Sequence, residues 1–594
     1  MRFFVGFIIF WVSIIGYLNI FKRRFKIPLE LLFPLLFTCI SLIIFLAGIL
    51  NMLKVCSLLI CLGGIVLLFY DLFKKRFVLP KYLNINIFII LAFFLYFTII
   101  CFNMHVMHYD NYSHWALICK CMFIKDAFPN FSDFLISFKG YQPGSACFIY
   151  YVSLLLGKNE GSMIIAQNYL LISFFFSLLV FTDNNKNKKI NYIMKALVIV
   201  FYLFIILGNI KYNDLLVDSL ISAVGICICA FIYYFKKDLK KQFINVLPLC
   251  IFIFLIKNIG LVLVGFVCIY YFIYGINNKM IKKGFKYSII TGLSTLLFFY
   301  IWSRHVSYVF DFMALGSNHT LSSSHILYTV RQLGINNFYK FITVYFNNFI
   351  DVLHNIPNIY MIIINGILVI LIVTLKKCRK SFIKCLLISD LIYLSYYLIL
   401  GFMYVISFNW DEMIILAGFT RYMMSIVYII IGIVLIFIIN NLIKYYNNKK
   451  YSYIIVCCLI IGCLFINYKY SINGNFSLLV GDFSYKDSIP YKFDRALNDD
   501  FYKADSVSYF YIYKHNHSVT EGGYTRFLSK YKLYTHRYKY VDNIDDIKKY
   551  DREEAKNFNK RLIILENDED INKYIKNNDY KKLRNNYYVK YLKK

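Results

Sequence analysis

Long apolar runs alternate with short polar segments along the first 470 residues of the chain. The runs are roughly 18 residues or longer, which lets a helix cross a hydrocarbon core about 30 Å thick. The pattern predicts a polytopic bundle of about 14 transmembrane helices. The candidate spans are residues 3–20, 28–50, 55–72, 84–103, 162–182, 190–209, 215–235, 243–257, 258–275, 285–303, 357–375, 383–406, 421–441 and 451–468.

Clusters of lysine and arginine occupy short polar segments between the runs, at 22–26, 74–76, 186–189, 236–241, 279–286, 376–384 and 444–450. Short basic loops mark the cytoplasmic side of a membrane protein. Both termini and two long loops, 104–161 and 304–356, are therefore expected on the outer side. The net charge of +32 then reflects membrane topology, and no nucleic-acid partner is expected.

From residue 471 onward the sequence becomes polar. Strand-like runs alternate there with helical patterns, which predicts a small extracytoplasmic α/β domain over 471–594 after a transmembrane domain over 1–470. The strand-like runs are 507–513, 536–541, 561–566 and 587–592, and the helical patterns are 543–558 and 568–578. The apolar stretch 146–157 is too short to cross and is expected to form an interfacial or re-entrant helix.

Nearly all of the 16 cysteines lie in or beside apolar runs, and none lies beyond Cys463. The tail therefore has no disulfide framework. Cys119 and Cys121 form an isolated C-x-C pair, which is better explained by buried small apolar side chains than by zinc ligands. The first run, 3–20, has no small-residue cleavage site and is expected to stay in the protein as a helix.

The most unusual polar cluster is MHYDNYSHWALICKCM at 107–122, directly after an apolar run. Asp110 and His114 are four residues apart, so a helix that begins here holds both on one face. A carboxylate beside an imidazole suits a general base oriented by its neighbour. Two alternatives remain open. Trp115 and the tyrosines could serve as interface anchors among solvated groups, or His108, Asp110 and His114 could bind a metal, which is less favoured because no further ligand is evident.

Two acids and a lysine stand at the predicted outer ends of other spans. Asp214 and Asp218 are one helical turn apart, and acids in membrane segments are candidates for functional sites. The alternative is that they pair with Lys211 or cap the helix. Lys257 interrupts an apolar run, where an unpaired ammonium is costly to bury. A phosphate partner would satisfy it, and snorkelling to the interface is the alternative.

Arg421 opens a span after a turn that contains Asp411 and Glu412. Its guanidinium can bind a lipid-linked phosphate through two hydrogen bonds, and the alternative is a salt bridge to one of these two acids. The Gly-Tyr-Gln-Pro-Gly turn at 140–144 is expected to fold the first external loop back toward the bilayer, because proline restricts φ and glycine permits positive φ.

In these segments the chain resembles the polytopic membrane glycosyltransferases of the GT-C superfamily, and in particular an uncharacterised bacterial branch. The resemblance rests on YDNYSHW at 109–115, YQPG at 141–144, NDLLVD at 213–218, LIKNIG at 255–260 and GFTRY at 418–422. Relatives often carry a second acid where this chain has Asn111. That difference favours a mechanism with one aspartate and no cofactor, and a divalent metal is not favoured.

The resemblance implies an inverting hexosyl- or pentosyltransferase in the cell membrane, with its site on the extracytoplasmic side. The donor would be a sugar on a polyprenyl-phosphate carrier, and the acceptor a cell-envelope polymer, lipid or protein. The catalytic residues would be Asp110, as the base, and His114. The substrate-binding residues would be Lys257, Arg421, Asp214, Asp218, Tyr141, Trp115 and Glu412. A transporter or flippase of lipid-linked saccharides is the alternative, and a silent scaffold is a third class.

Overall fold

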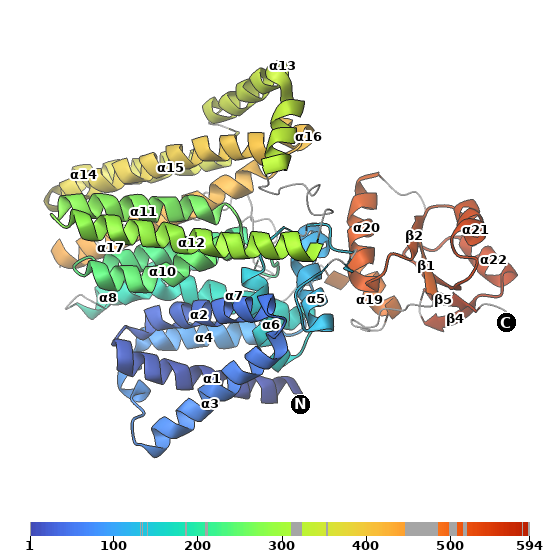
Figure 1. The fold of residues 1–594 in the computed structure, drawn as a ribbon, viewed down its shortest axis with the longest axis horizontal. Helices are drawn as coiled ribbons and strands as arrows, with labels where there is room; N and C mark the ends of the chain where they lie inside the picture. Colours follow the sequence, from blue (N-terminus) through green and yellow to red (C-terminus); the bar gives the residue numbers. More distant parts are fainter. Residues whose placement is uncertain are drawn as a thin grey trace.

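The computed structural model describes residues 2–130, 132–133, 135–138, 140–183, 187–207, 212–310, 323–351, 354–445, 485–486, 488–497, 508–514, 519–584 and 586–591. Figure 1 shows a bundle of long helices with a smaller unit of helices and strands at one end. The prediction of a mainly α polytopic bundle with a small C-terminal α/β unit is confirmed.

Eleven helical segments of the described residues are long and apolar enough to cross a membrane, so the chain is a multi-pass membrane protein. They are formed by α1 (Arg2–Phe25), α2 (Leu29–Ile49), α3 (Leu53–Phe73), α7 (Glu160–Phe175) with η3 (Phe176–Phe181), α8 (Lys188–Ile206), α10 (Leu239–Ile256), α11 (Gly260–Asn277), α12 (Ile281–Phe310), α14 (Ile356–Thr374), η5 (Lys376–Cys378) with α15 (Arg379–Ser407), and α17 (Phe419–Tyr445).

Two further apolar helices, α4 (Ile85–Cys101) and α9 (Asp218–Tyr234), have 17 residues each. With them, every predicted span up to 421–441 falls on a helix. The predicted span 451–468 and the predicted domain boundary at 470 lie outside the described residues.

Burial differs strongly among the helices of the bundle. In the segment Glu160–Phe181, 94% of the most apolar window is buried, against 33% for α3 and α11. Large apolar side chains on α3 and α11, such as Leu59 and Ile269, are exposed. Exposed apolar surface of this kind suits helices that face lipid, whereas α7 forms part of the core.

Between α4 and α7 the chain forms three elements that pack against the bundle: the π-helical turn η2 (Asn111–Trp115), α5 (Ala116–Lys125) and α6 (Gly144–Leu156). The stretch predicted to be interfacial or re-entrant coincides with α6, which is buried on most sides and contacts α1, α2 and α7. Within the expected second external loop, 304–356, the structure has the end of α12 and the helix α13 (Ser323–Ile350).

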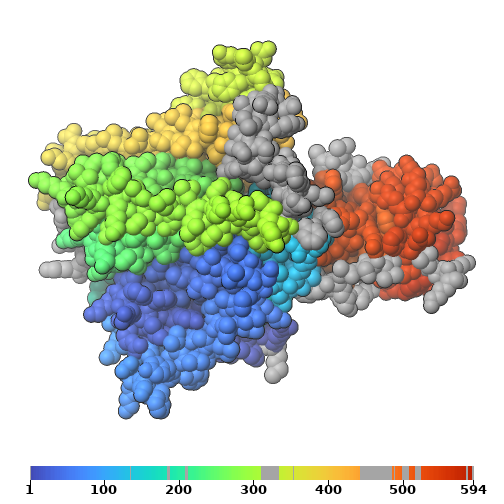
Figure 2. Space-filling view, viewed as in Figure 1, coloured from blue at the N-terminus to red at the C-terminus, as the bar shows by residue number. Residues whose placement is uncertain are grey.

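The C-terminal unit contains a five-stranded sheet in the order β2-β1-β3-β5-β4. Strand β1 is parallel to β2 and β3, whereas β5 is antiparallel to β3 and β4. The elements are α19 (Ile489–Leu497), β1 (Ser508–Tyr513), α20 (Val519–Leu533), β2 (Tyr538–Val541), α21 (Ile544–Glu553), β3 (Asn559–Ile564), α22 (Glu569–Asn577), β4 (Lys581–Arg584) and β5 (Tyr587–Lys590). In Figure 2 this lobe projects from the bundle end where residues of the first loop lie.

The predicted turn at 140–144 brings two backbones into contact. Gly144 begins α6 directly against the end of α10, where a Cβ on Gly144 would lie 2.5 Å from the carbonyl oxygen of Leu255. The indole nitrogen of Trp302 donates to the carbonyl oxygen of Gly140 at 2.9 Å. Only a glycine lets the first loop approach α10 this closely.

Replacing Gly144 with alanine is expected to destabilise the protein by about 1–3 kcal/mol, because the two backbones must separate. Thermal unfolding of the purified protein in detergent measures the effect. Gly265→Ala in α11 is the matched control, since nothing lies within 4 Å of a Cβ at that position. Equal unfolding temperatures for the two variants would contradict the close approach.

Candidate active site

Four charged side chains from four separate segments form one chain of ion pairs. Arg421 Nη1 lies 2.6 Å from Asp110 Oδ2, and Arg421 Nε lies 3.1 Å from Asp218 Oδ2. Lys257 Nζ lies 2.9 Å from Asp218 Oδ1. The order Asp110–Arg421–Asp218–Lys257 alternates in sign, and the four formal charges cancel. We call these four residues the ion chain.

Each member of the ion chain stands at a helix end. Asp110 precedes η2, Asp218 is the first residue of α9, and Arg421 lies in the first turn of α17. Lys257 has an extended backbone in the short break between α10 and α11. A carboxylate at the start of a helix is stabilised by the helix dipole, which adds to the pairing of Asp218.

The two acids of the ion chain are buried, with side chains exposed by 8% for Asp110 and 4% for Asp218. Buried charges are tolerated only when paired, and removing one partner typically costs about 3–5 kcal/mol. Burial alone would raise the pKa of Asp110, but Arg421 and His114 outweigh it and hold this pKa below its usual range. Asp110 is therefore an ionised carboxylate at neutral pH.

The predicted relation between Asp214 and Asp218 is wrong. Asp214 lies before α9, which begins only at Asp218, so the two carboxylates do not share a helical face. Asp214 Oδ1 instead accepts a hydrogen bond of 3.0 Å from the side-chain amide of Asn111. The oxygen of the same amide accepts one of 3.1 Å from the backbone N–H of Leu215. Asn111 thereby ties the segment with Asp110 to the segment that leads into Asp218.

The imidazole of His114 interacts with the carboxylate of Asp110, since its charge is one of the causes that lower the pKa of Asp110. A helical element does begin at this point, as the π-turn η2. His114 Nδ1 lies 2.6 Å from Ser113 Oγ, while the carboxylate of Asp110 is paired with Arg421. His108 Nδ1 lies 3.9 Å from Asp110 Oδ2 and accepts the Asp110 backbone N–H at 3.1 Å.

Aromatic rings surround the ion chain on the side of the first loop. Trp115 and Tyr141 stack with centroids 5.4 Å apart, and His114 meets Tyr141 edge-on at 5.0 Å. Trp115 is buried, so its ring packs inside the protein and not on the exposed surface where an interface anchor would lie. The ammonium of Lys257 stands 4.3 Å from the ring centre of Tyr422, a cation–π contact that stabilises a charge in partly desolvated surroundings.

Two contacts at this site are absent from the sequence-based prediction. The first is the contact of Tyr422 with Lys257. Because Tyr422 directly follows Arg421 in the GFTRY segment, its position beside a candidate site residue could have indicated a role at the site. Gln142 donates a short hydrogen bond to Asn258, which joins the turn at 140–144 to the break after α10. No local pattern indicates that bond.

Glu412 lies on the short helix α16 (Trp410–Ile414), and burial raises the pKa of its carboxyl group. The alternative of a salt bridge between Arg421 and Glu412 or Asp411 is not what the structure has, because the ion pairs of Arg421 are with Asp110 and Asp218. Lys211, the predicted alternative partner of the acids, lies outside the described residues.

Within the part of the chain that the structure describes, no group of three or more His, Cys, Asp or Glu side chains is arranged to hold a metal ion. The trio His108, Asp110 and His114 therefore does not form such a group here. The carboxylate of Asp110 is engaged by a guanidinium instead.

Comparison with known proteins gives one likeness of fold. The crystal structure of ArnT from Cupriavidus metallidurans bound to undecaprenyl phosphate resembles this chain over 85% of this chain and 97% of ArnT, at 10% sequence identity and a TM-score of 0.41. Similarity at that level carries over neither a site nor a substrate. No family model and no curated protein matches the sequence.

Replacing Asn111 with aspartate is expected to destabilise the protein at neutral pH by about 1–3 kcal/mol, because it removes a buried donor and sets a carboxylate against Asp214. The pKa of the new carboxyl group is raised in the folded state, so the destabilisation grows as the pH rises and shrinks as the pH falls. Thermal unfolding at pH 7.5 and pH 5 measures this. A pH-independent loss of stability would contradict the placement of Asn111 against the carboxylate of Asp214.

Proposed function

We propose that this protein is an inverting membrane glycosyltransferase. It moves a sugar from a polyprenyl-phosphate carrier to a hydroxyl group of a cell-envelope acceptor on the extracytoplasmic side, with Asp110 as the general base. The observation that carries the proposal is the ion chain, in which two buried carboxylates and two cations meet beside aromatic rings at the ends of apolar helices. The motif resemblance to GT-C enzymes supports the same reaction.

The cations of the ion chain suit the phosphate of the donor. A guanidinium binds phosphate oxygens through two parallel hydrogen bonds, and an ammonium adds a point charge. Arg421 and Lys257 are each compensated by an aspartate before the donor arrives. The phosphate therefore enters by exchange: Arg421 turns from Asp110 to the phosphate and releases the carboxylate.

The released carboxylate then acts as the base. The acceptor oxygen attacks the anomeric carbon while its proton passes to Asp110. The bond between the anomeric carbon and the phosphate oxygen breaks, and the polyprenyl phosphate leaves with the electron pair. Arg421 and Lys257 stabilise the charge that develops on that oxygen. Trp115 and Tyr141, which stack on each other in the first loop, line the site of the sugar. Attack opposite the leaving group inverts the configuration.

Asp110→Asn is expected to lower the transfer rate by about 10²–10⁴-fold, the usual contribution of a general base, and to leave donor binding in place. Transfer is measured in proteoliposomes that contain polyprenyl-phosphate sugars and cell-envelope acceptor. Asp411→Asn is the matched control, because this exposed acid lies outside the ion chain. Full activity of Asp110→Asn would move the base elsewhere. Passage of lipid-linked sugar across the bilayer without transfer would indicate a transporter.

The pH profile of kcat/KM provides a second test, because this ratio reports groups of the free enzyme. In the wild type, kcat/KM is expected to fall only when the pH drops below the usual range of an aspartate, about 3.9, since Arg421 holds the pKa of Asp110 down. In Arg421→Gln, the guanidinium no longer opposes the effect of burial, so the pKa of Asp110 rises. The acid limb of the profile is therefore expected to move to higher pH.

Lys257→Met is the control for that profile. Lys257 pairs with Asp218 and not with Asp110, so this variant is expected to raise KM for the donor and to leave the acid limb where it is in the wild type. An unmoved limb in Arg421→Gln would show that a group other than Asp110 controls the acid side of the profile.

A further inference from the structure

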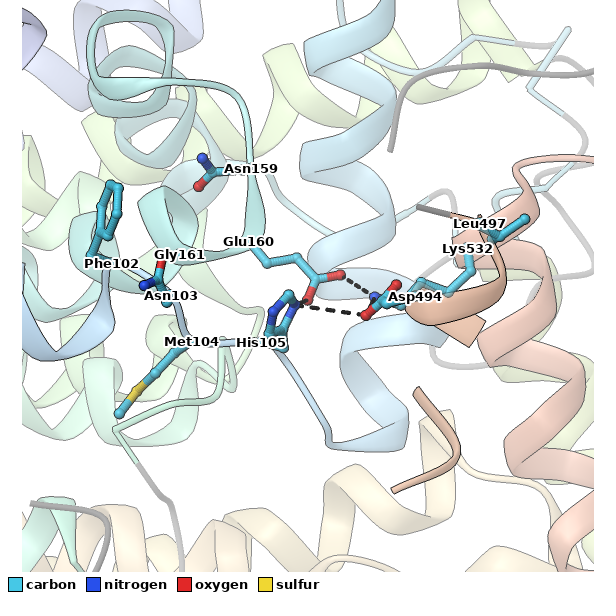
Figure 3. A pocket seen from close by; sticks show the side chains of 10 residues that line it. All are labelled: Phe102, Asn103, Met104, His105, Asn159, Glu160, Gly161, Asp494, Leu497 and Lys532. Carbon is cyan, nitrogen blue, oxygen red and sulfur yellow. Dashed lines mark hydrogen bonds and ion pairs between the residues drawn. The ribbon is translucent and has the colours of Figure 1, made fainter. Parts of the chain in front are cut away.

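The junction between the C-terminal unit and the bundle contains a buried lysine. Lys532, near the end of α20, places its Nζ 2.8 Å from Glu160 Oε1 and 2.8 Å from Asp494 Oδ2. The side chains of Lys532 and Glu160 are each only 4% exposed. Figure 3 shows the three side chains converging from α20, from the start of α7 and from α19.

Glu160 extends this contact into the first loop. Its second oxygen, Oε2, accepts the backbone N–H of Val106 at 3.2 Å and lies 3.0 Å from His105 Nδ1. The hydroxyl of Tyr112 donates to the carbonyl oxygen of Val106. The hydroxyl of Tyr524, on α20, donates to the carbonyl oxygen of Met107 at 3.0 Å. The backbone at 106–107, shortly before Asp110, is thus held on several sides.

Helix α20 also packs directly on η2. The ring of Tyr112 lies 5.7 Å from Tyr524 and 5.3 Å from Tyr531, centre to centre. The ring of Tyr109, next to Asp110, meets Phe527 at 5.6 Å. A helix of the C-terminal unit therefore covers the residues on both sides of Asp110.

A second buried lysine closes the end of α20. Lys120, on α5, donates to the carbonyl oxygens of Tyr531 at 2.6 Å and Lys532 at 3.3 Å. A cation at a helix C-terminus satisfies carbonyls that have no partner within the helix. Lys120 and Lys532 together fasten α20 to two elements of the first loop region.

We propose that the C-terminal unit is a positioning element for the catalytic loop, and that Lys532 is its principal positioning residue. By holding Glu160 it holds residues 106–112, and with them the alignment of Asp110 on Arg421. This proposal rests on the proposed function for its kinetic consequences. Its structural consequence, the order of residues 106–112, is independent of the reaction.

Loss of the Lys532 ammonium is expected to separate α20 from the first loop without unfolding the C-terminal unit. A cavity of about 450 Å³ borders this junction, lined by His105, Glu160, Asp494 and Lys532 among others. In Lys532→Met, water from this cavity can reach the two carboxylates, so α20 can separate from the loop without leaving buried unpaired charges. The strands of the C-terminal unit do not take part in the contact and stay folded.

Hydrogen exchange of the full-length protein in detergent tests the proposal. In Lys532→Met, the amides of 106–112 are expected to exchange at least 10-fold faster, while those of β3 keep their protection. In the transfer assay kcat is expected to fall 10-fold or more with KM for the donor unchanged. Lys532→Arg, which keeps the charge, is expected to restore both. Lys548→Met, at an exposed lysine of α21 paired with Asp545, is the matched control and should match the wild type.

Unchanged exchange at 106–112 in Lys532→Met, with β3 protected, would overturn the proposal whatever the activity. Faster exchange together with no transfer by the wild type would support positioning and refute the proposed function. If Lys532→Met loses the protection of β3, Glu160→Gln decides, because it weakens the same ion pair from the bundle side. Faster exchange at 106–112 in Glu160→Gln supports the proposal, and unchanged exchange overturns it.

Discussion

The pairing of Arg421 with Asp110 is the interaction on which the arrangement of the site depends. It joins residues 311 positions apart in the chain. A charge withdrawn from water is stable only beside its partner. The start of α17 and the first loop must therefore meet, and Asp218 and Lys257 bring the ends of α9 and α10 to the same place. Four segments that are far apart in the sequence thereby meet at one cluster of side chains whose formal charges cancel.

The helices could be predicted because lipid imposes a simple rule on length and composition. The charged positions Asp110, Asp218, Lys257 and Arg421 could be predicted for the same reason, since each interrupts or borders an apolar run. Their mutual pairing could not, because nothing local links Asp110 with Arg421. The pattern of Asp214 and Asp218 was misleading for a related reason: the hydrogen bonds of Asn111 hold residues 214 and 215 outside the helix.

In the C-terminal unit, too, elements with a local sequence pattern could be predicted and elements that depend on distant contacts could not. The strands β1, β2, β3 and β5 and the helices α21 and α22 follow local patterns and were predicted. Helix α20 was not, because its Glu-Gly-Gly sequence does not favour a helix and its order comes from Tyr524, Phe527 and Tyr531 packed on the first loop. Strand β4 is short and rich in lysine, as edge strands often are, so its sequence carries little apolar signal.

The contact between Lys532 and Glu160 has a consequence for the order in which parts of the protein assemble during synthesis. The two residues are 372 positions apart, and at typical rates of synthesis the ribosome needs roughly 20–70 s to cover that distance. The ion chain is complete only once Arg421 has been made, late in this interval. At that point the loop with Asp110 still lacks the helix that covers it. The loop with Asp110 therefore stays uncovered in the newly inserted bundle until α20 has been translated and has docked.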